Sequence, residues 1–159
     1  MSSWQEVEKA APELAAAVRE RFEAHGLGLV ATLRRDGGPR ICGIEPLFAH
    51  GDLWLGMMPE SLKAADLRRD PRLALHSATV DKNVAAGDAR ITGRAEEVAD
   101  SARRDAYLAA LREATGFEPD ALGLFRVEVT ELSFVLPKDD TLTISSWREG
   151  AGVRVVTKH

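Results

Sequence analysis

The sequence predicts a mainly β protein: a closed or nearly closed antiparallel barrel with few helices. Short, apolar, β-rich segments follow one another along most of the chain. Tight turns at 36–39 (Asp-Gly-Gly-Pro) and 50–52 (His-Gly-Asp) join them as hairpins. Helical patterns occur in only three places. Because closure of a sheet removes its exposed strand edges, a barrel is favoured over an open sheet.

Length and composition are those of one soluble domain over residues 1–159. The net charge of −4 argues against a nucleic-acid-binding protein, which would usually be basic. No apolar run approaches membrane-spanning length, and the first residues lack the basic and apolar segments of a secretory signal. A single cysteine, Cys42, excludes an internal disulfide, and with four scattered histidines no metal site is expected. We therefore expect a cytoplasmic protein.

The first helix is predicted from Pro12, which suits a first helical turn, to the pair His25-Gly26, which ends it. Its apolar residues recur at helical spacing, at Leu14, Val18 and Phe22. Before this helix, residues 4–7 are expected to form only a short turn.

The strands are predicted from apolar, β-rich runs and the turns between them. They cover 27–33, 40–48, 53–58, 72–79, 88–98, 124–136, 142–147 and 153–156. We interpret the first three as an antiparallel meander. Gly93 indicates a bulge or bend in the fifth strand. In the sixth, the apolar positions change phase at Thr130-Glu131, which predicts a β-bulge because one inserted residue exchanges the two faces.

Two further helices are predicted between the strands. A short one runs from Ser61 to Arg69, and Asp70-Pro71 ends it. A longer one begins at Asp100 or Ser101 and ends at Gly116. Its apolar positions include Ala106, Leu108 and Leu111.

Ser61 and Lys63 open the short helix and form the clearest candidate site. A serine hydroxyl suits an N-cap, while the free N–H groups and the positive end of the helix dipole suit a phosphate. Lys63 adds a full positive charge in the same turn. An ordinary capped helix with a solvated lysine explains the same residues, so the motif alone leaves both interpretations open.

Several motifs follow one another in a fixed order. They are Ala31-Thr32-Leu33, Asp36-Gly37-Gly38-Pro39-Arg40, Leu53-Trp54-Leu55, Ser61-Leu62-Lys63-Ala64 with Leu67, Asp70-Pro71-Arg72 and Gly93-Arg94-Ala95. In this combination the chain resembles the FMN-binding, Greek-key-like split β-barrel family related to pyridoxamine 5′-phosphate oxidase. The resemblance is most specific over residues 27–98. It implies one antiparallel split β-barrel domain over residues 1–159, with an N-terminal helix and two further helices.

The resemblance also implies a homodimer with two flavin sites at the subunit interface. Ser61 and Lys63 carry over to the site of the flavin phosphate. The other implied cofactor-binding residues are Arg40, Cys42, Gly43, Ile44, Glu45, Gly56, Met57, Met58, Asp88 and Trp147. Trp147 resembles the aromatic residue with which a partner subunit covers the flavin ring in many members.

Gly56 would let the backbone approach a flat ring, and the soft thioether of Met57 or Met58 could pack on that ring. Each of these residues also has a structural explanation. Gly56 can mark a bulge, the two methionines can fill a core, Cys42 can be a small buried residue, and Trp147 can anchor a dimer interface.

The sequence departs from the family at four positions. Cys42, Leu47 and Leu62 each stand in place of a cation that binds the flavin phosphate, and Asp88 replaces a glutamine that contacts the ring. Arg40 and Arg72 are the candidates to compensate. The residues from 153 to 159 also lack the basic substrate-binding motif of the oxidase, so we do not expect oxidation of pyridoxamine phosphate itself.

The function that these implications predict is an FMN-dependent oxidoreductase that transfers hydride to or from a small-molecule substrate. A reductase that uses the deazaflavin coenzyme on the same fold is one alternative, because the cations expected at the FMN phosphate are missing. A non-catalytic flavin-binding module is the other. No side chain in the sequence is assigned a role as catalytic acid or base.

Overall fold

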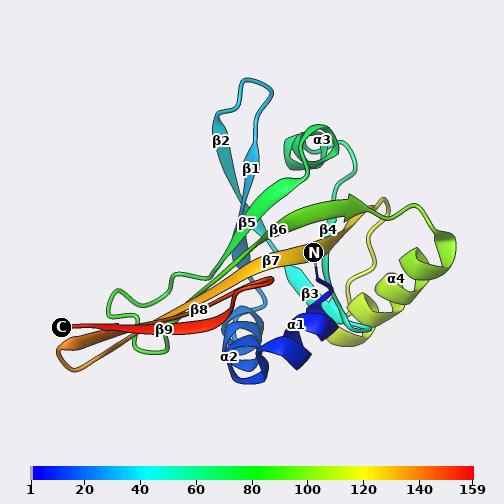
Figure 1. The fold of residues 1–159 in the computed structure, drawn as a ribbon. Coiled ribbons are helices and arrows are strands. Elements are labelled where there is room, and N and C mark those ends of the chain that lie inside the picture. Colours follow the sequence, from blue (N-terminus) through cyan, green and yellow to red (C-terminus); the bar gives the residue numbers. More distant parts are fainter. Residues whose placement is uncertain (1) are drawn as a thin grey trace.

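The computed structural model describes residues 2–159, which form a nine-stranded antiparallel sheet and four helices (Figure 1). The helices are α1 (Trp4–Ala10), α2 (Pro12–Glu23), α3 (Leu62–Arg69) and α4 (Ser101–Thr115). The strands are β1 (Gly28–Leu33), β2 (Pro39–Ile44), β3 (Pro46–Ala49), β4 (Asp52–Met57), β5 (Arg72–Ser77), β6 (Asp88–Glu97), β7 (Gly123–Lys138), β8 (Thr141–Arg148) and β9 (Gly152–Lys158). The predicted fold class, mainly antiparallel β with few helices, is confirmed.

The two ends of the sheet are joined through Glu45 of the chain, without a ladder between them. The strands pair in the order β2-β1-β5-β6-β7-β4-β3, so β2 and β3 are the two ends of this path. Only Glu45 separates these two ends in the sequence. The predicted single strand over 40–48 is therefore wrong, as is the meander: β2 pairs with β1 and β3 with β4. Pro46 begins β3 because proline lacks the N–H that a continuous ladder would use.

β7 is the longest strand, with 16 residues, and it serves two parts of the structure. Its first residues pair with β4 and its last ones with β8, while β6 runs along its other edge. The β8–β9 hairpin extends from this strand to one side of the molecule, and α4 lies at the other (Figure 1).

The predicted bulge lies in β7. Thr92 is opposite Glu131, whereas Gly93 is opposite Val129, so Thr130 is the inserted residue. A Cβ atom at Gly93 would collide with the carbonyl oxygen of Glu128, which explains the glycine at this point of β6. Both sequence signals, the change of phase in β7 and the glycine in β6, are therefore confirmed.

The N-terminal helices cover the main core. The prediction of a short turn at 4–7 is wrong, because Ser3 begins α1 with a capping box in which its hydroxyl accepts from the N–H of Glu6 and the Glu6 side chain accepts from Ser3. Trp4 of α1 and Phe22 of α2 are fully buried against the barrel. None of the helices within residues 2–159 is long and apolar enough to cross a membrane.

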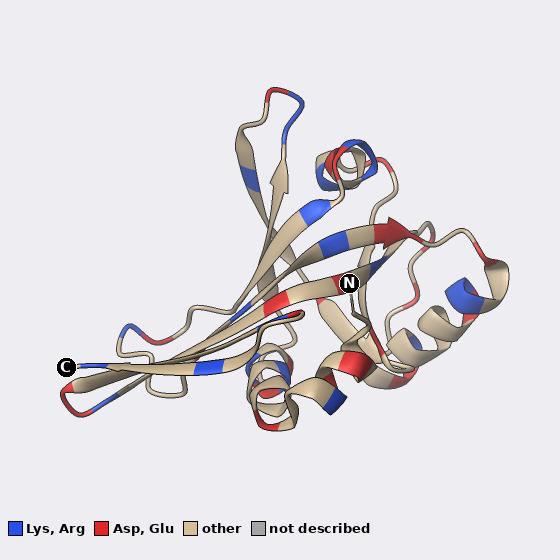
Figure 2. Ribbon diagram, in the orientation of Figure 1, with Lys and Arg blue, Asp and Glu red and all other residues tan. Residues whose placement is uncertain are grey.

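Asp66 ties α3 to the barrel. This carboxylate is 2% exposed and accepts hydrogen bonds from Thr32 Oγ1 at 2.7 Å, Arg40 Nε at 2.7 Å and Arg69 Nη2 at 2.8 Å. Burial raises the pKa of the carboxyl, but the hydrogen bonds from Arg40, Thr32 and Arg69 outweigh burial and hold the pKa below its usual range. Figure 2 shows that α3 carries both basic and acidic residues.

We expect Asp66→Asn to lower the free energy of unfolding by about 3 kcal/mol at pH 7, because both arginines lose their carboxylate. Urea denaturation measures this loss. Since the folded pKa lies below the ordinary 3.8, the Asp66 contribution is fully present above that value and disappears as the pH falls toward the folded pKa. The difference between parent and variant should therefore shrink below about pH 4.

Asp105→Asn, at an exposed position of α4, is the matched control and should change stability by less than about 0.5 kcal/mol. Equal losses in the two variants would contradict the structural role of Asp66.

Candidate functional site

A cavity of about 410 Å³ opens between strand ends and α3 on one side and α4 with the loop after it on the other. It is lined by Leu27, Gly43, Ile44, Glu45, Gly56, Met57, Met58, Lys63, Tyr107, Leu111, Phe117, Pro119, Ala121 and Leu122. The residues of this set that the sequence predicted are those from 43 to 45, those from 56 to 58, and Lys63. The structure therefore brings most of the predicted cofactor residues to one cavity.

The ends of β2 and β4 form the first wall of the cavity. Gly43 and Glu45 are exposed, while Ile44 between them points into the main core. Met57 is the last residue of β4 and is buried, and Met58 after it is 74% exposed. Met57 packs in the main core, so this wall presents strand backbone and the exposed thioether of Met58, a surface on which a flat ring can lie.

The first turn of α3 forms the second wall. Ser61 is its N-cap, as predicted, because Ser61 Oγ accepts a hydrogen bond from the N–H of Ala64 at 3.3 Å. The N–H groups of Leu62 and Lys63 have no partner among residues 2–159. Two free N–H donors, the helix dipole and the Lys63 ammonium together fit a phosphate group.

Arg40 and Asp88, two of the predicted cofactor residues, lie away from the cavity. The Arg40 guanidinium binds Asp66, so it holds α3 in place rather than lining the cavity. Asp88 Oδ2 lies 3.7 Å from His76 Nε2, at the start of β6. Arg72, the other candidate to replace the missing cations, pairs with Asp70 at 2.7 Å.

Cys42 and Trp147 pack against the main core instead of lining the cavity. Cys42 alternates with Gly43 along β2 and therefore points inward. Trp147 of β8 is 5% exposed and belongs to the core of its own subunit. In this position it packs beside the β7–β8 ladder. It does not project from the subunit, as a residue that covers the flavin ring of a partner subunit would.

The third wall, from α4 and the loop after it, was not predicted from the sequence. Tyr107 and Leu111 are the buried residues of α4, one turn apart, whereas Ala106 is exposed. Asp100 caps this helix and Gly116 ends it, as expected. Two signals could have marked the wall: Tyr107 is the single tyrosine of the chain, and it shares a helix face with Leu111.

The Tyr107 hydroxyl lies against the backbone of β4. A Cβ atom at Gly56 would collide with this hydroxyl, so the glycine makes room for the tyrosine. The ring of Tyr107 packs beside Trp54, with 6.2 Å between ring centroids. Burial, and then the negative charge of Glu45, raise the pKa of Tyr107 to about 12, which keeps the phenol neutral.

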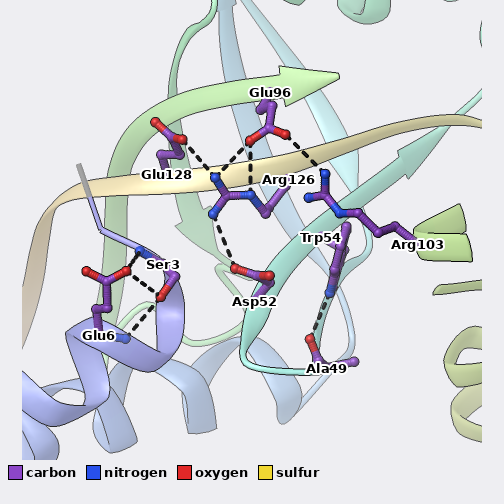
Figure 3. Close-up of polar contacts among 9 residues, drawn as sticks. All are labelled: Ser3, Glu6, Ala49, Asp52, Trp54, Glu96, Arg103, Arg126 and Glu128. Atoms are coloured by element: carbon purple, nitrogen blue, oxygen red, sulfur yellow. Dashed lines mark hydrogen bonds and ion pairs between the residues drawn. The ribbon is translucent and has the colours of Figure 1, made fainter. Parts of the chain in front are cut away.

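A network of charges around Arg126 fixes α4 to the sheet (Figure 3). Arg126 Nη2 donates to Glu96 at 2.8 Å and to Glu128 at 2.7 Å, and its Nη1 donates to Asp52 at 3.3 Å. Glu96 also accepts from Arg103 of α4 at 3.2 Å. The hydrogen bond from Arg126 holds the pKa of Glu96 below its usual range, so the carboxylate stays charged. β4, β6, β7 and α4 are thereby joined beside the cavity.

We expect Gly56→Ala to destabilise the protein by about 2 kcal/mol, because the new methyl group meets the Tyr107 hydroxyl. Adding Tyr107→Phe removes that hydroxyl and should recover part of the loss in a double-mutant cycle of thermal or urea unfolding. Gly43→Ala is the matched control, since its Cβ would meet nothing within 4 Å. A loss at Gly43 as large as that at Gly56 would rule out this explanation.

One protein family has a sequence model that matches this chain. The sequence model of the family described as Pyridoxamine 5′-phosphate oxidase matches residues 14–136, more than half of the 159 residues. No curated protein matches the chain.

Solved structures share the fold at low identity. The conserved hypothetical protein Rv2991 from Mycobacterium tuberculosis is 22% identical, with a TM-score of 0.61, covering 74% of this chain and 81% of that one. HutZ, the heme storage protein from Vibrio cholerae, is 15% identical, with a TM-score of 0.59 and coverage of 76% and 89%. An F420 reductase is 18% identical, with a TM-score of 0.53 and coverage of 67% and 88%. With the family match and the split-barrel architecture in agreement, this chain belongs to the pyridoxamine 5′-phosphate oxidase family.

Proposed function

We propose that this protein is an FMN-dependent oxidoreductase that transfers hydride to or from a small substrate. The observation that carries the proposal is that the first turn of α3, with Lys63, borders the same cavity as the strand ends at Gly43 and Met58. The Tyr107 hydroxyl takes the space over Gly56, so the approach of a ring to that glycine, which the sequence suggested, is not available. The α3 turn suits a phosphate and the strand ends suit a flat ring. These are the two parts of FMN that the protein would have to hold.

Different residues of the cavity would hold different parts of the cofactor. The N–H groups of Leu62 and Lys63 and the Lys63 ammonium would hold the phosphate, and Met58 would pack on the ring. The apolar face of α4 would close the opposite side of the cavity and limit the access of water. The bound flavin would itself supply the hydride-transfer chemistry.

A reductase that uses the deazaflavin coenzyme is the second candidate. Lys63 is the one cation in the wall of the cavity as far as residues 2–159 are described, and the three cations that the family resemblance leads us to expect are replaced by Cys42, Leu47 and Leu62. The F420 reductase among the similar structures supports this candidate at the level of the fold. The heme storage protein is similar in fold at 15% identity, and this likeness assigns no cofactor to the cavity.

Titration with FMN and with riboflavin, followed by visible absorption, tests the first candidate. We expect saturable FMN binding, and a loss of about tenfold in FMN affinity for Lys63→Ala because a charge-assisted hydrogen bond to phosphate disappears. Riboflavin, which lacks the phosphate, should bind parent and variant equally. Lys82→Ala, in the exposed loop at 80–87, is the matched control and should bind FMN like the parent.

An unchanged FMN affinity in Lys63→Ala would remove the phosphate assignment. A protein that ignores FMN and binds the deazaflavin coenzyme would support the second candidate. FMN binding without oxidation or reduction of any substrate would support a non-catalytic flavin-binding module.

We also infer that two copies of the chain share the cavity. Leu27, Met58 and Phe117 line the cavity and are 50%, 74% and 58% exposed. Apolar side chains gathered at a cavity mouth indicate a surface that another surface covers. A second copy would bury them and enclose the cofactor.

Sedimentation equilibrium should therefore give twice the chain mass of 17.3 kDa. Met58→Glu should shift the equilibrium toward monomer, because the interface would have to bury a charge. Val80→Glu changes a comparably exposed apolar residue outside the cavity mouth and should leave the dimer intact. A monomeric parent protein would contradict the shared site.

A further inference from the structure

The wall formed by α4 and its following loop differs in chemistry from the α3 wall. Apart from one tyrosine hydroxyl, its side chains in the cavity are apolar: Leu111, Phe117, Pro119, Ala121 and Leu122. Such a wall favours a ligand that is mainly apolar and makes a single polar contact.

The arginines of α4 are all engaged outside this wall. Arg103 pairs with Glu96 at 3.2 Å and Arg112 with Glu118 at 3.1 Å. Arg104 donates to two backbone carbonyl oxygens, those of residues 98 and 122, at 3.1 and 2.7 Å. None of the three lines the cavity. An anionic group on this side would therefore lose its hydration without gaining a positive partner.

The charged residues elsewhere in the cavity wall also disfavour an anionic ligand. Lys63 belongs to the α3 wall, where it would be occupied by the phosphate of the cofactor. Glu45 borders the cavity and would repel a second anion. The α4 side of the cavity is thus suited to an uncharged ligand.

The Tyr107 hydroxyl supplies the one polar contact. The residue is 2% exposed, and none of the described hydrogen bonds involves its hydroxyl. The hydroxyl oxygen is not among the enclosed atoms that lack a partner, so it is open to the cavity, where an acceptor on a ligand can replace water. Gly56 and Trp54 fix the position of the ring, which leaves the hydroxyl in one place.

We propose that the α4 wall is the substrate compartment, and that its substrate is an uncharged, mainly apolar molecule whose one hydrogen-bond acceptor binds the Tyr107 hydroxyl. The proposal rests on the proposed function in naming the ligand a substrate. The recognition itself follows from the cavity wall alone.

Three probes of nearly equal size test this recognition. They are 2-acetylnaphthalene, which is neutral and carries a carbonyl acceptor, 2-naphthoate, which is anionic, and 2-ethylnaphthalene, which has no acceptor. The chain contains three methionines, and Met57 and Met58 line the cavity. Titrations of protein labelled with ¹³C at the methionine methyl groups therefore report binding in the cavity.

We expect the ketone to shift the Met57 and Met58 signals saturably and to bind at least about tenfold more tightly than the naphthoate. Tyr107→Phe should weaken ketone binding about fivefold, the usual effect of one neutral hydrogen bond. The same variant should bind ethylnaphthalene like the parent, which shows that its cavity is intact. Equal affinities for ketone and naphthoate, or a Tyr107→Phe variant with parental ketone affinity, would overturn the proposal.

Repeating the ketone titration with saturating FMN separates this proposal from the cofactor assignment. A protein that fails to bind FMN but still discriminates the three probes contradicts the cofactor and leaves the α4 compartment in place. Competitive displacement of the ketone by FMN contradicts a separate substrate compartment while leaving the cofactor in place.

Discussion

The change of strand partner at Glu45 and Pro46 is the constraint on which the cavity depends. Up to Ile44 the chain pairs with β1, and from Pro46 onward it pairs with β4. Proline has no N–H to donate and restricts the residue before it, so no ladder continues through this point. The two ends of the sheet path are consequently adjacent here, and the end of β2, Glu45 and the end of β4 line one cavity.

Two clusters of arginine and carboxylate fix the other walls around this opening. Asp66 accepts from Arg40 and Arg69 and holds α3 against the barrel, which places Lys63 at the cavity. Arg126 joins three strands to α4 through Glu96, which places the tyrosine of α4. In both clusters every carboxylate has a positive partner, so partly buried charges hold the helices instead of destabilising them.

The elements themselves could largely be predicted because their signals are local. The bulge in β7 was visible in the phase change at Thr130, and the α3 cap was visible in Ser61. The missed helix α1 also had a local signal, the spacing of Ser3 and Glu6 in a capping box. The break at Glu45 had a weaker signal in the sequence, because apolar residues continue on both sides of it and only Pro46 marks the interruption.

Most segments, the caps of α3 and α4 and the bulge in β7 could be read from the sequence, because spacing and turn residues act over a few positions. The contacts of the side chains could not be read in this way. Arg40 binds a carboxylate on α3, Trp147 enters the core, and Tyr107 reaches the backbone of β4. Periodicity records which face of an element is apolar, but the partner of that face is set by packing between segments far apart in the chain.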